Sequence, residues 1–547
     1  MLYLLLSVGV IFSSLLGIGM LFEKLLGKLW EEKLSSAFFA GCMGLSLVWA
    51  VLAFAMPINR VVEVSSLVLG LSAFVYFKMY RFLGVFITKN YLIFAPLLFI
   101  VLLFGSGYPF ILDHFGYYVP SIKWIAEVGL VKGIGNLDLI LGQMSLWHIL
   151  QAGFSNTSDV FLRLNVVLLL GYIIYIIEKK VWVHFIFLPI LLLFLQSPST
   201  DLPVIVGSLI ILNEVLNKNH NVSALFGFSV WIFSIKPTII WLPLMVFLYA
   251  FLIRKFSYRL IIVGVGVVSV FVIKNWYCFG FPVFPVQVLD LDLSWKPNEF
   301  LLKNSAETAI LKTYDFQYSY EVIKQFSVWE SVKNWIFLKG IKGVINIAFV
   351  LSLLALLLFA IKSKSRLIWL IVISIFIKSV LVLLFSAQYR FFLEVFFVVV
   401  LLIFGSWFSA KKVALALVSI IGTLGMSVFL FTPSLIVKYV PSFRLGGFIK
   451  NIELSQVVKP ATYKYQRYKT FTIGNLTFNV VDNYPFSFDT PLPAISPSFL
   501  ELYLEAGIFP QKIGLNLKEG FVWKKLSNKD REQLQQIVNG FYINEKR

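Results

Sequence analysis

Long apolar runs alternate with short basic connections along most of the chain. A helix needs about 20 mainly apolar residues to cross the ~30 Å hydrocarbon core of a bilayer. The pattern therefore predicts about fourteen membrane-spanning segments, several of them short enough to be half-spans. They lie near residues 1–22, 35–55, 61–77, 91–108, 160–177, 182–196, 201–216, 222–235, 237–253, 260–276, 342–361, 367–385, 391–409 and 413–431.

Three longer pieces between or after these runs are polar enough to lie outside the hydrocarbon, namely 109–159, 277–341 and 432–547. The first piece favours interfacial helices, with Trp124, Ile125, Val128 and Leu130 facing the lipid and the charged Lys123, Glu127 and Lys132 facing the headgroups. The second piece is helical and partly amphipathic by the same reasoning. Both would be outer loops of a transmembrane module covering residues 1–431.

The last piece has a different pattern. Residues 468–482, "YKTFTIGNLTFNVVD", alternate as a strand does, and "DTPLPAISPS" at 489–498 is rich in turn-forming residues. We expect a small α+β domain over 432–547. The fold class is therefore mainly α, a polytopic bundle with a small extramembrane domain.

Composition agrees with a membrane protein, since 59% of the 547 residues are hydrophobic and only 14% are charged. A soluble globular chain has roughly 25% charged residues. Seventeen Lys and Arg residues fall in one alternating set of loops, which the positive-inside rule assigns to the cytoplasm. They are Lys24, Lys28, Lys33, Lys78, Arg81, Lys89, Lys179, Lys180, Lys218, Arg254, Lys255, Arg259, Lys362, Lys364, Arg366, Lys411 and Lys412.

This bias accounts for much of the net charge of +19 and so gives no reason to expect a nucleic-acid partner. It places the N-terminus and the three polar pieces on the outer side. The first apolar run lacks a preceding positive residue and a small-residue cleavage site, so we expect a retained span. The two Cys and four His predict neither a disulfide framework nor a His-built metal site.

Ionisable and polar residues gather at the outer ends of several predicted spans. They are Asp113, His114, Asp201, Lys236, Lys274, Asn275, Gln388 and Arg390. A charged side chain at mid-membrane costs ~2.5–3.5 kcal/mol on insertion scales and less near the interface, so each one requires a reason.

Structural roles are the competing explanation for each of these residues. A Lys or Arg can extend to the headgroups, and Arg390 can pair with Glu394 one helical turn further on. Asp113 can cap a helix starting near Gly116, and Asp201 a helix starting at Leu202. His114 is compatible with simple packing, and the Tyr and Trp residues with an interfacial belt.

Considered together, the residues suit transfer from a lipid-linked phosphate donor. Cations from several spans would hold the phosphate and stabilise its growing charge as it leaves. A carboxylate would accept a proton from an attacking hydroxyl.

The motifs carrying these residues resemble the C-type glycosyltransferase (GT-C) superfamily, and more closely a group of bacterial inner-membrane proteins of that type. The resemblance rests on Asp113 with Tyr117, "KWIAEVGLVKGIGNL" (123–137), "SPSTDLP" (197–203), "IKPTIIWLP" (235–243), "KNWYCFGFPVFP" (274–285) and "TPLP" (490–493). Two features depart from it: no second acidic residue follows Asp113, and "LILGQMS" (139–145) lacks the Arg typical of the closer group.

The resemblance implies an inverting, metal-independent transferase that takes a sugar from a polyprenyl-phosphate donor on the periplasmic face of a bacterial inner membrane. Asp113 would be the base, and Lys236, Lys274 and Arg390 would bind the donor phosphate. His114, Tyr117, Lys123, Asp201, Asn275 and Gln388 would position the sugar or the acceptor, which would be a glycan, a lipid or a protein. No cofactor is expected, and the use of a metal stays open.

Three other functions stay open at this stage. A flippase or another transporter would also need cations for phosphate, usually near mid-membrane. An O-antigen polymerase or ligase would use a polyprenyl carrier without an Asp base. A scaffold would tolerate replacement of Asp113, Lys236, Lys274 or Arg390.

Overall fold

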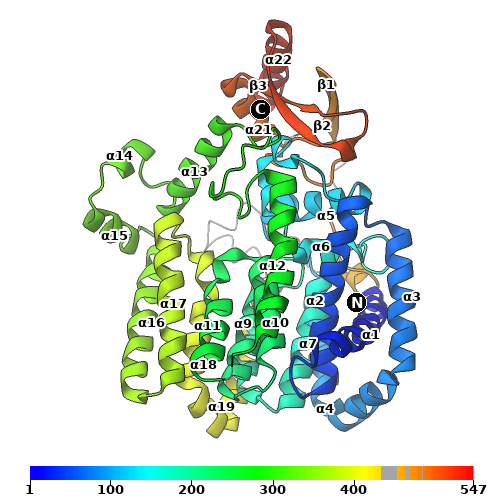
Figure 1. Ribbon diagram of the computed structural model, residues 1–547, viewed down its shortest axis with the longest axis vertical. Helices are drawn as coiled ribbons and strands as arrows, with labels where there is room; N and C mark the ends of the chain where they lie inside the picture. Colours follow the sequence, from blue (N-terminus) through cyan, green and yellow to red (C-terminus); the bar gives the residue numbers. More distant parts are fainter. Residues whose placement is uncertain (255, 433–452, 464–466, 483, 546–547) are drawn as a thin grey trace.

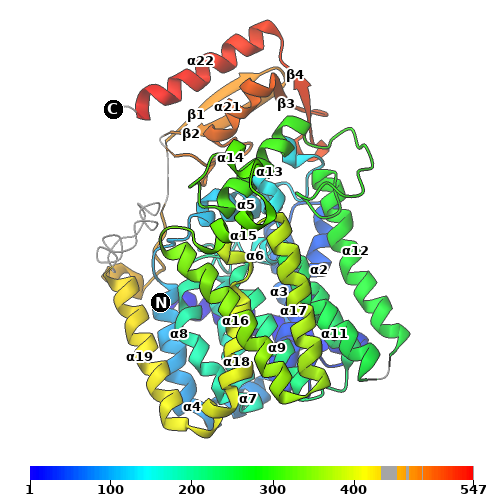
Figure 2. The same ribbon diagram turned by 90° about the vertical axis from the view of Figure 1, so that its left-hand side faces the viewer.

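The computed structural model describes residues 1–254, 256–432, 453–463, 467–482 and 484–545. The described chain is mainly helical, with 70% of it in helix and a small sheet region near its C-terminal end. Figure 1 shows a broad helical body with the C-terminal strands and helices on top of it. The turned view in Figure 2 shows the same two layers. The predicted C-terminal domain includes 433–452, which lie outside the described residues.

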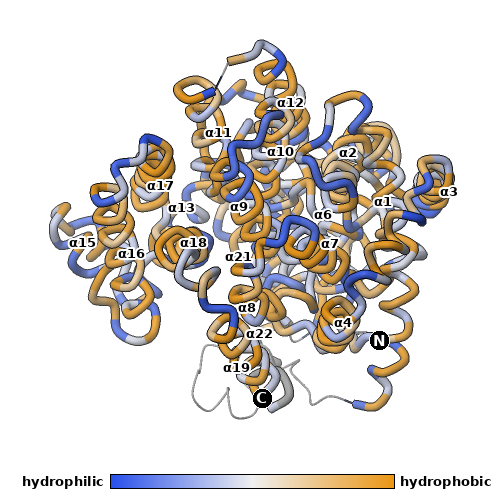
Figure 3. The backbone as a smooth tube through the Cα atoms, turned by 90° about the horizontal axis from the view of Figure 1, so that it is seen from below, coloured by the Kyte–Doolittle hydropathy of each residue, from blue (hydrophilic) through white to orange (hydrophobic). Residues whose placement is uncertain are grey.

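Among the described residues, seven helices are long and apolar enough to cross a membrane. This is the expected signature of a membrane protein. They are α1 (Leu2–Leu26), α2 (Lys33–Ala55), α4 (Met79–Gly105), α12 (Tyr258–Phe279), α16 (Ile341–Ser363), α17 (Arg366–Phe385) and α18 (Leu393–Ala410). Figure 3 looks at the body from below, where hydrophobic colouring predominates along the helices.

The other seven predicted segments also coincide with helical structure, and all but the one at α19 fall on shorter elements. Four of them fall on the shorter apolar stretches Trp182–Phe194, Val222–Ile235, Pro237–Leu252 and Lys412–Val428. These contain η4 (Trp182–Phe187), α8 (Leu188–Leu191), η5 (Leu192–Phe194), α10 (Val222–Ile235), η6 (Pro237–Ile239), α11 (Trp241–Leu252) and α19 (Lys412–Phe431). The remaining three are α3 (Arg60–Tyr76), α7 (Leu164–Lys179) and α9 (Asp201–Leu216).

One predicted boundary is wrong. The span expected at 91–108 belongs to α4, which begins twelve residues earlier and carries Arg81 and Lys89 within the helix. The early part of the helix has regular backbone hydrogen bonding despite its charges, because Arg and Lys are good helix formers. Arg81 and Lys89 limit where the membrane-embedded part of α4 can begin, whereas the helix itself begins earlier.

The first two helices pack closely through small residues. A Cβ on Gly19 would lie 1.7 Å from the Ala37 carbonyl oxygen, and a Cβ on Gly41 would lie 2.1 Å from that of Leu15. Only glycine permits such an approach, which is how helices commonly associate when water supplies no driving force. The α1–α2 contact therefore depends on these two positions.

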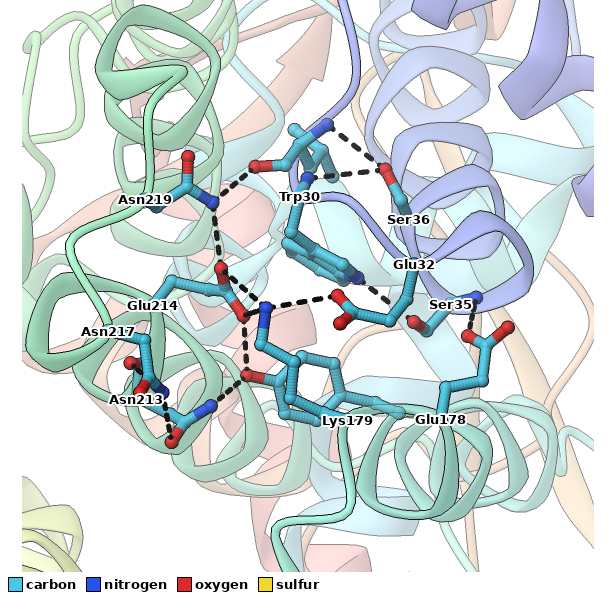
Figure 4. A network of polar contacts seen from close by, with 12 residues as sticks. Trp30, Glu32, Ser35, Ser36, Glu178, Lys179, Asn213, Glu214, Asn217 and Asn219 are labelled. Atoms are coloured by element: carbon cyan, nitrogen blue, oxygen red, sulfur yellow. Dashed lines mark hydrogen bonds and ion pairs between the residues drawn. The ribbon is translucent and has the colours of Figure 1, made fainter.

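Basic connections gather at the end of the body opposite the C-terminal domain. Arg259 donates to the Leu25 carbonyl, Asn221 to that of Lys28, and Asn219 to that of Leu29. Figure 4 shows the polar network beside them, in which Lys179 contacts Glu32 at 3.0 Å and Glu214 at 3.2 Å. Most of these groups have partners, so we assign the network a structural role that fixes the helix ends.

We call residues 109–159 and 277–341 the first and second outer segments, after their predicted position. The first is built of short elements: η1 (His114–Tyr118), α5 (Val119–Glu127), η2 (Ile134–Asn136), η3 (Leu139–Gln143) and α6 (Leu146–Ala152). The expectation that Trp124, Ile125 and Leu130 face lipid is wrong, since all three are buried in protein. The Trp124 ring packs edge-on against Phe521 of the C-terminal domain, with centroids 5.9 Å apart. The apolar face is covered by the chain itself, which sequence periodicity cannot distinguish from lipid.

The second outer segment is helical as predicted, with α13 (Glu299–Thr313), α14 (Tyr320–Lys324) and α15 (Val328–Ile336). Figure 1 shows α14 and α15 projecting sideways near the upper end of α16. This segment is far more exposed than the first.

The C-terminal domain is α+β, as its pattern predicts. It contains η9 (Leu454–Val457), β1 (Tyr468–Ile473), β2 (Leu476–Val481), α21 (Pro497–Ala506), β3 (Ile508–Lys512), η10 (Leu517–Glu519), β4 (Phe521–Lys525) and α22 (Asn528–Glu545). The strands form two antiparallel hairpins, β1–β2 and β3–β4. Gly474 at φ 59° makes the first turn, in a backbone region that suits glycine.

Buried hydrogen bonds hold this domain on the first outer segment. Ser496 donates to Asp138 at 2.6 Å, and the Tyr503 hydroxyl donates to the Asn136 carbonyl at 2.8 Å. Lys518 donates to the carbonyls of Ala53 and Leu130. These contacts attach the C-terminal domain to the first outer segment. We call these two parts together the roof, because they cover the upper end of the helical body.

Candidate functional site

Four charged side chains from distant parts of the chain meet at the upper end of the helices. Arg390 donates to the Asp113 carboxylate at 2.6 Å, and Lys236 donates to the Asp201 carboxylate at 2.5 Å. Lys236 also donates to the backbone carbonyl of Arg390 at 3.0 Å, which joins the two ion pairs. We call these four residues the charge cluster.

Each member of the charge cluster stands at the end of a helical element. Asp113 directly precedes η1, Asp201 is the first residue of α9, and Lys236 follows the last residue of α10. Arg390 lies in η7 (Tyr389–Phe391), the short connection between α17 and α18. Residues at helix ends can hold charge next to an apolar body, because their side chains reach beyond the hydrocarbon.

Three of the competing structural roles do not hold. Neither Asp113 nor Asp201 accepts a capping hydrogen bond within its own helix. Arg390 pairs with Asp113, while Glu394 pairs with Lys378. The acidic residues are therefore used for contacts between elements.

The charge cluster is partly accessible rather than sealed. The side-chain exposure is 20% for Asp113, 33% for Arg390, 13% for Lys236 and 17% for Asp201. Burial lowers the pKa of the Arg390 guanidinium, but the charges of Asp113, Tyr117, Asp201 and Tyr118 together more than offset this, and the pKa ends above its ordinary value. Arg390 is therefore a permanent cation beside the carboxylate.

Buried tyrosines lie close enough to the charge cluster to interact with its charges. Tyr117 is buried, and burial followed by the charge of Asp113 raises the pKa of its hydroxyl. Its ring contacts Tyr118 and His148, with centroids 4.5 Å and 5.6 Å away. Tyr117 is thus a neutral phenol close enough to Asp113 for the charge of the carboxylate to act on it. Its positioning role stays a prediction.

His114 is packed against its neighbour instead of facing the carboxylate partners. It is 3% exposed, and its ring meets Phe115 with centroids 4.5 Å apart. Burial, and then the charge of Arg163, keep the pKa of His114 well below its usual range. At neutral pH it is an uncharged side chain, consistent with the packing role considered above.

Lys274 and Asn275 make contacts of their own, away from the charge cluster. Lys274 is fully buried and donates to the Met144 carbonyl at 2.7 Å. Asn275 donates to the Pro282 carbonyl at 2.9 Å. These contacts are structural, and a phosphate role for Lys274 stays a prediction.

Lys123 and Gln388 lie near the edges of the site region. Lys123 pairs with Asp489 of the C-terminal domain at 3.2 Å. Gln388, two residues before Arg390, donates to the Ser386 hydroxyl at 2.8 Å. Lys123 is thereby tied to the roof, and Gln388 to the connection that carries Arg390.

Sequence reasoning missed two residues that influence the charge cluster electrostatically. The pKa of Lys312 on α13 is lowered, first by desolvation and then by the positive charge of Arg390, while Asp113 opposes the shift. The pKa of the Tyr484 hydroxyl is raised by burial and then by the charge of Asp113. A single Lys in an amphipathic helix gives no sequence signal of its own.

A third omission did have a signal. Lys378 lies within the apolar run of α17 and is fully buried against Glu394, which is in the first turn of α18. A Lys inside a spanning segment is rare enough to mark a site or a partner. Lys378 is also close enough to Lys236 for their charges to repel.

No group of three or more His, Cys, Asp or Glu side chains suited to holding a metal occurs among the described residues. The model of one protein family, described as a domain of unknown function (DUF8201), matches residues 1–397. Comparisons with curated proteins and with solved structures gave no match.

Proposed function

This protein belongs to the DUF8201 family, and we propose that it is a membrane glycosyltransferase of GT-C type that uses a polyprenyl-phosphate sugar as donor. The observation that carries the proposal is the charge cluster, in which two carboxylates and two cations meet at the ends of apolar helices. A lipid-linked phosphate donor keeps its tail in the membrane and its phosphate at that level. Positioning is then supplied largely by the lipid itself.

The charges fit such a donor. Asp113 and Asp201 balance Arg390 and Lys236, and the nearby Lys312 adds one further positive charge. A phosphodiester carries one negative charge, so its arrival would complete the balance. A fork of guanidinium donors suits a phosphate as well as it suits a carboxylate.

Donor binding would also free the base. Arg390 would turn from Asp113 toward the donor phosphate, which leaves the carboxylate open to an acceptor hydroxyl. Asp113 would then take the hydroxyl proton as the oxygen attacks the anomeric carbon. The bond from that carbon to the phosphate oxygen breaks with inversion, and its electron pair stays on the departing polyprenyl phosphate.

Arg390 and Lys236 would stabilise the second negative charge that develops on the leaving phosphate. Tyr117, Asp201 and Gln388 would contact sugar or acceptor hydroxyls. The role of Lys123 would be indirect, through its contact with Asp489 in the roof. We assign no step to Lys274, Asn275 or His114, because each is buried and contacts groups outside the charge cluster. Their roles in binding stay predictions.

We place the site on the periplasmic side of a bacterial inner membrane, and we retain a count of about fourteen crossings. The orientation is supported by the basic connections, which occupy the end opposite the charge cluster. The positive-inside rule assigns that end to the cytoplasm. The count is supported by the seven long apolar helices with the shorter ones between them.

A transporter is the second candidate, favoured by the buried pair of Lys378 and Glu394. Lys378 is seven residues from the last residue of α17, a depth of about 10 Å along a helix. Charged groups inside a helical body are typical of transport pathways. A polymerase or ligase that works without an Asp base is the remaining alternative.

The test uses purified protein in nanodiscs with a panel of short-chain polyprenyl-phosphate sugars. Released polyprenyl phosphate is followed by mass spectrometry for wild type, Asp113→Asn and Asp113→Glu. The control is Asp292→Asn, an outer carboxylate that is 91% exposed. We expect release from one donor by wild type and the control and its loss in Asp113→Asn. Equal release by all variants would favour the base-free enzyme, and translocation of intact donor into vesicles would favour the transporter.

A further inference from the structure

The helix α15 carries an exposed apolar face. Val328 and Trp329 are 85% and 73% exposed, and Phe337 directly after the helix is 68% exposed. Val332 continues the same face, being four residues after Val328. A patch of this kind on an outer segment marks a surface that is covered in the working protein.

Other side chains of α15 anchor the helix to the body. Trp335 is buried, and its indole nitrogen donates to the Ala387 carbonyl at 2.9 Å. Asn346 of α16 donates to the Trp335 carbonyl at 2.8 Å. The exposed face is therefore presented by a fixed helix rather than by a loose tail.

The position of α15 identifies what covers the face. Only four residues separate α15 from α16, which is one of the helices able to cross the membrane. The outward side of α16 is apolar from its first turn, with Ile341, Val344 and Leu351 exposed. The apolar face of α15 is thus continuous with a surface that faces hydrocarbon.

Charge on the same segment fits a lipid surface. Lys333 and Lys339 are exposed at and just beyond α15, where ammonium groups can meet lipid phosphates. Trp at such a level is typical of membrane interfaces. Figure 2 shows α15 beside the upper part of α16, at the level where the helical body ends.

We propose that α15 lies in the headgroup region of the outer leaflet, with Val328, Trp329 and Phe337 embedded among the acyl chains. An apolar helix face of this kind enters the boundary by about 5–10 Å. The contrast with α5 is direct, because Trp124 and Ile125 of α5 are buried in protein whereas Val328, Trp329 and Val332 of α15 are exposed. This inference does not depend on the proposed transferase activity.

Hydrogen bonds also link α15 to the connection that carries Arg390. Trp335 holds the Ala387 carbonyl, and Thr313 of α13 accepts a hydrogen bond from the Ala387 amide at 3.2 Å. Ala387 lies three residues before Arg390. The helix α15 and the connection that carries Arg390 are therefore linked through Ala387.

The test places a polarity-sensitive fluorophore on single cysteines and measures quenching by phosphatidylcholine brominated near the headgroup end of its acyl chains. Both native cysteines are buried. The test positions are Trp329→Cys and, independently, Val328→Cys in full-length protein in nanodiscs. Leu351→Cys on α16 is the lipid reference, and Leu515→Cys, 90% exposed on the C-terminal domain, is the water reference.

We expect labels at 329 and 328 to be quenched by the brominated lipid to an extent comparable with the label at 351. Quenching no greater than at 515 would overturn the proposal. Protection from a water-soluble quencher without quenching by brominated lipid would also overturn it, because a second copy or another protein would then cover the face.

Discussion

The Arg390 guanidinium donates to the Asp113 carboxylate at 2.6 Å across 277 residues of sequence. The contact joins the connection between α17 and α18 to the start of the first outer segment. In the proposed mechanism, the Asp113 carboxylate becomes available as a base only when Arg390 binds another anion. The proposed donor phosphate is such an anion, and this exchange underlies the predictions below.

Replacing Arg390 should weaken donor binding. Arg390→Gln removes a charge-assisted contact worth about 1.5–3 kcal/mol, so the affinity for polyprenyl phosphate should fall by roughly 10- to 150-fold. Arg390→Lys should lose less, because it keeps the charge but not the planar fork. Titration of polyprenyl phosphate by native mass spectrometry in nanodiscs measures both, with Arg467→Gln on the C-terminal domain as control. Unchanged affinity in Arg390→Gln would argue against a phosphate site at this cluster.

The buried pair of Lys378 and Glu394 should show strong coupling. Lys378→Met or Glu394→Leu alone leaves an uncompensated buried charge and should destabilise the protein by about 3–5 kcal/mol. The double substitution should recover most of that loss, since an apolar pair replaces a desolvated ion pair. Thermal unfolding of the four proteins gives the cycle. Additive losses would mean that the two side chains do not interact as the structure indicates.

The same cycle separates the two candidate functions. If the pair only fixes α17 against α18, the stable double variant should keep donor release. A transporter that moves charge through the pair would lose translocation in the double variant although it folds. The two assays on one preparation distinguish these outcomes.

Stability should depend on the pH through Asp138. Burial raises the pKa of this carboxyl to about 6 from 3.8, and hydrogen bonds from Ser496 and the Ile140 amide offset part of the rise. Because the folded-state pKa is the higher one, folding takes up a proton. The stability from this group is complete below pH 3.8 and is lost as the pH rises through 6.

The full change is of the order of 3 kcal/mol. Asp138→Asn should remove the contribution of Asp138 to the pH dependence of the unfolding free energy, while it keeps a hydrogen-bond partner for Ser496. Unfolding of wild type and Asp138→Asn followed from pH 4 to pH 7 measures the difference. Identical slopes would show that Asp138 does not change its proton occupancy on folding.

The proposed orientation can be tested by accessibility. Leu515→Cys should react with a membrane-impermeant maleimide in spheroplasts, because the C-terminal domain would face the periplasm. Lys412→Cys, in a basic connection, should react only after the membrane is permeabilised. The opposite pattern would place the charge cluster on the cytoplasmic side and contradict a periplasmic reaction.

Much of the architecture could be predicted from hydrophobic pattern, because each apolar run has to form a helix inside a membrane. The strands of the β1–β2 hairpin could likewise be predicted from the alternation of apolar and polar residues in 468–482. What could not be predicted was the partner of an apolar face. Trp124 and Trp329 occur in similar amphipathic segments, yet the first is buried under Phe521 and the second is exposed.

The candidate site could likewise be predicted only in part. The types of residue at the helix ends indicated Asp113, Asp201, Lys236 and Arg390, and the structure brings all four together. Lys274 has the same sequence character but is buried against the Met144 carbonyl, 130 residues away in the chain. Charge at the end of a span predicts the level of a residue in the membrane, whereas the direction of its side chain depends on neighbours distant in sequence.

We propose that Asp113 acts as a base after Arg390 has moved to the donor phosphate. The most direct measurement determines donor affinity and turnover on the same preparations of wild type and Asp113→Asn. We expect Asp113→Asn to retain donor binding, because the Arg390 guanidinium stays available. Turnover should fall by roughly 10²- to 10⁴-fold, as expected for loss of a general base. Turnover equal to that of wild type, with binding intact, would show that Asp113 is not the base.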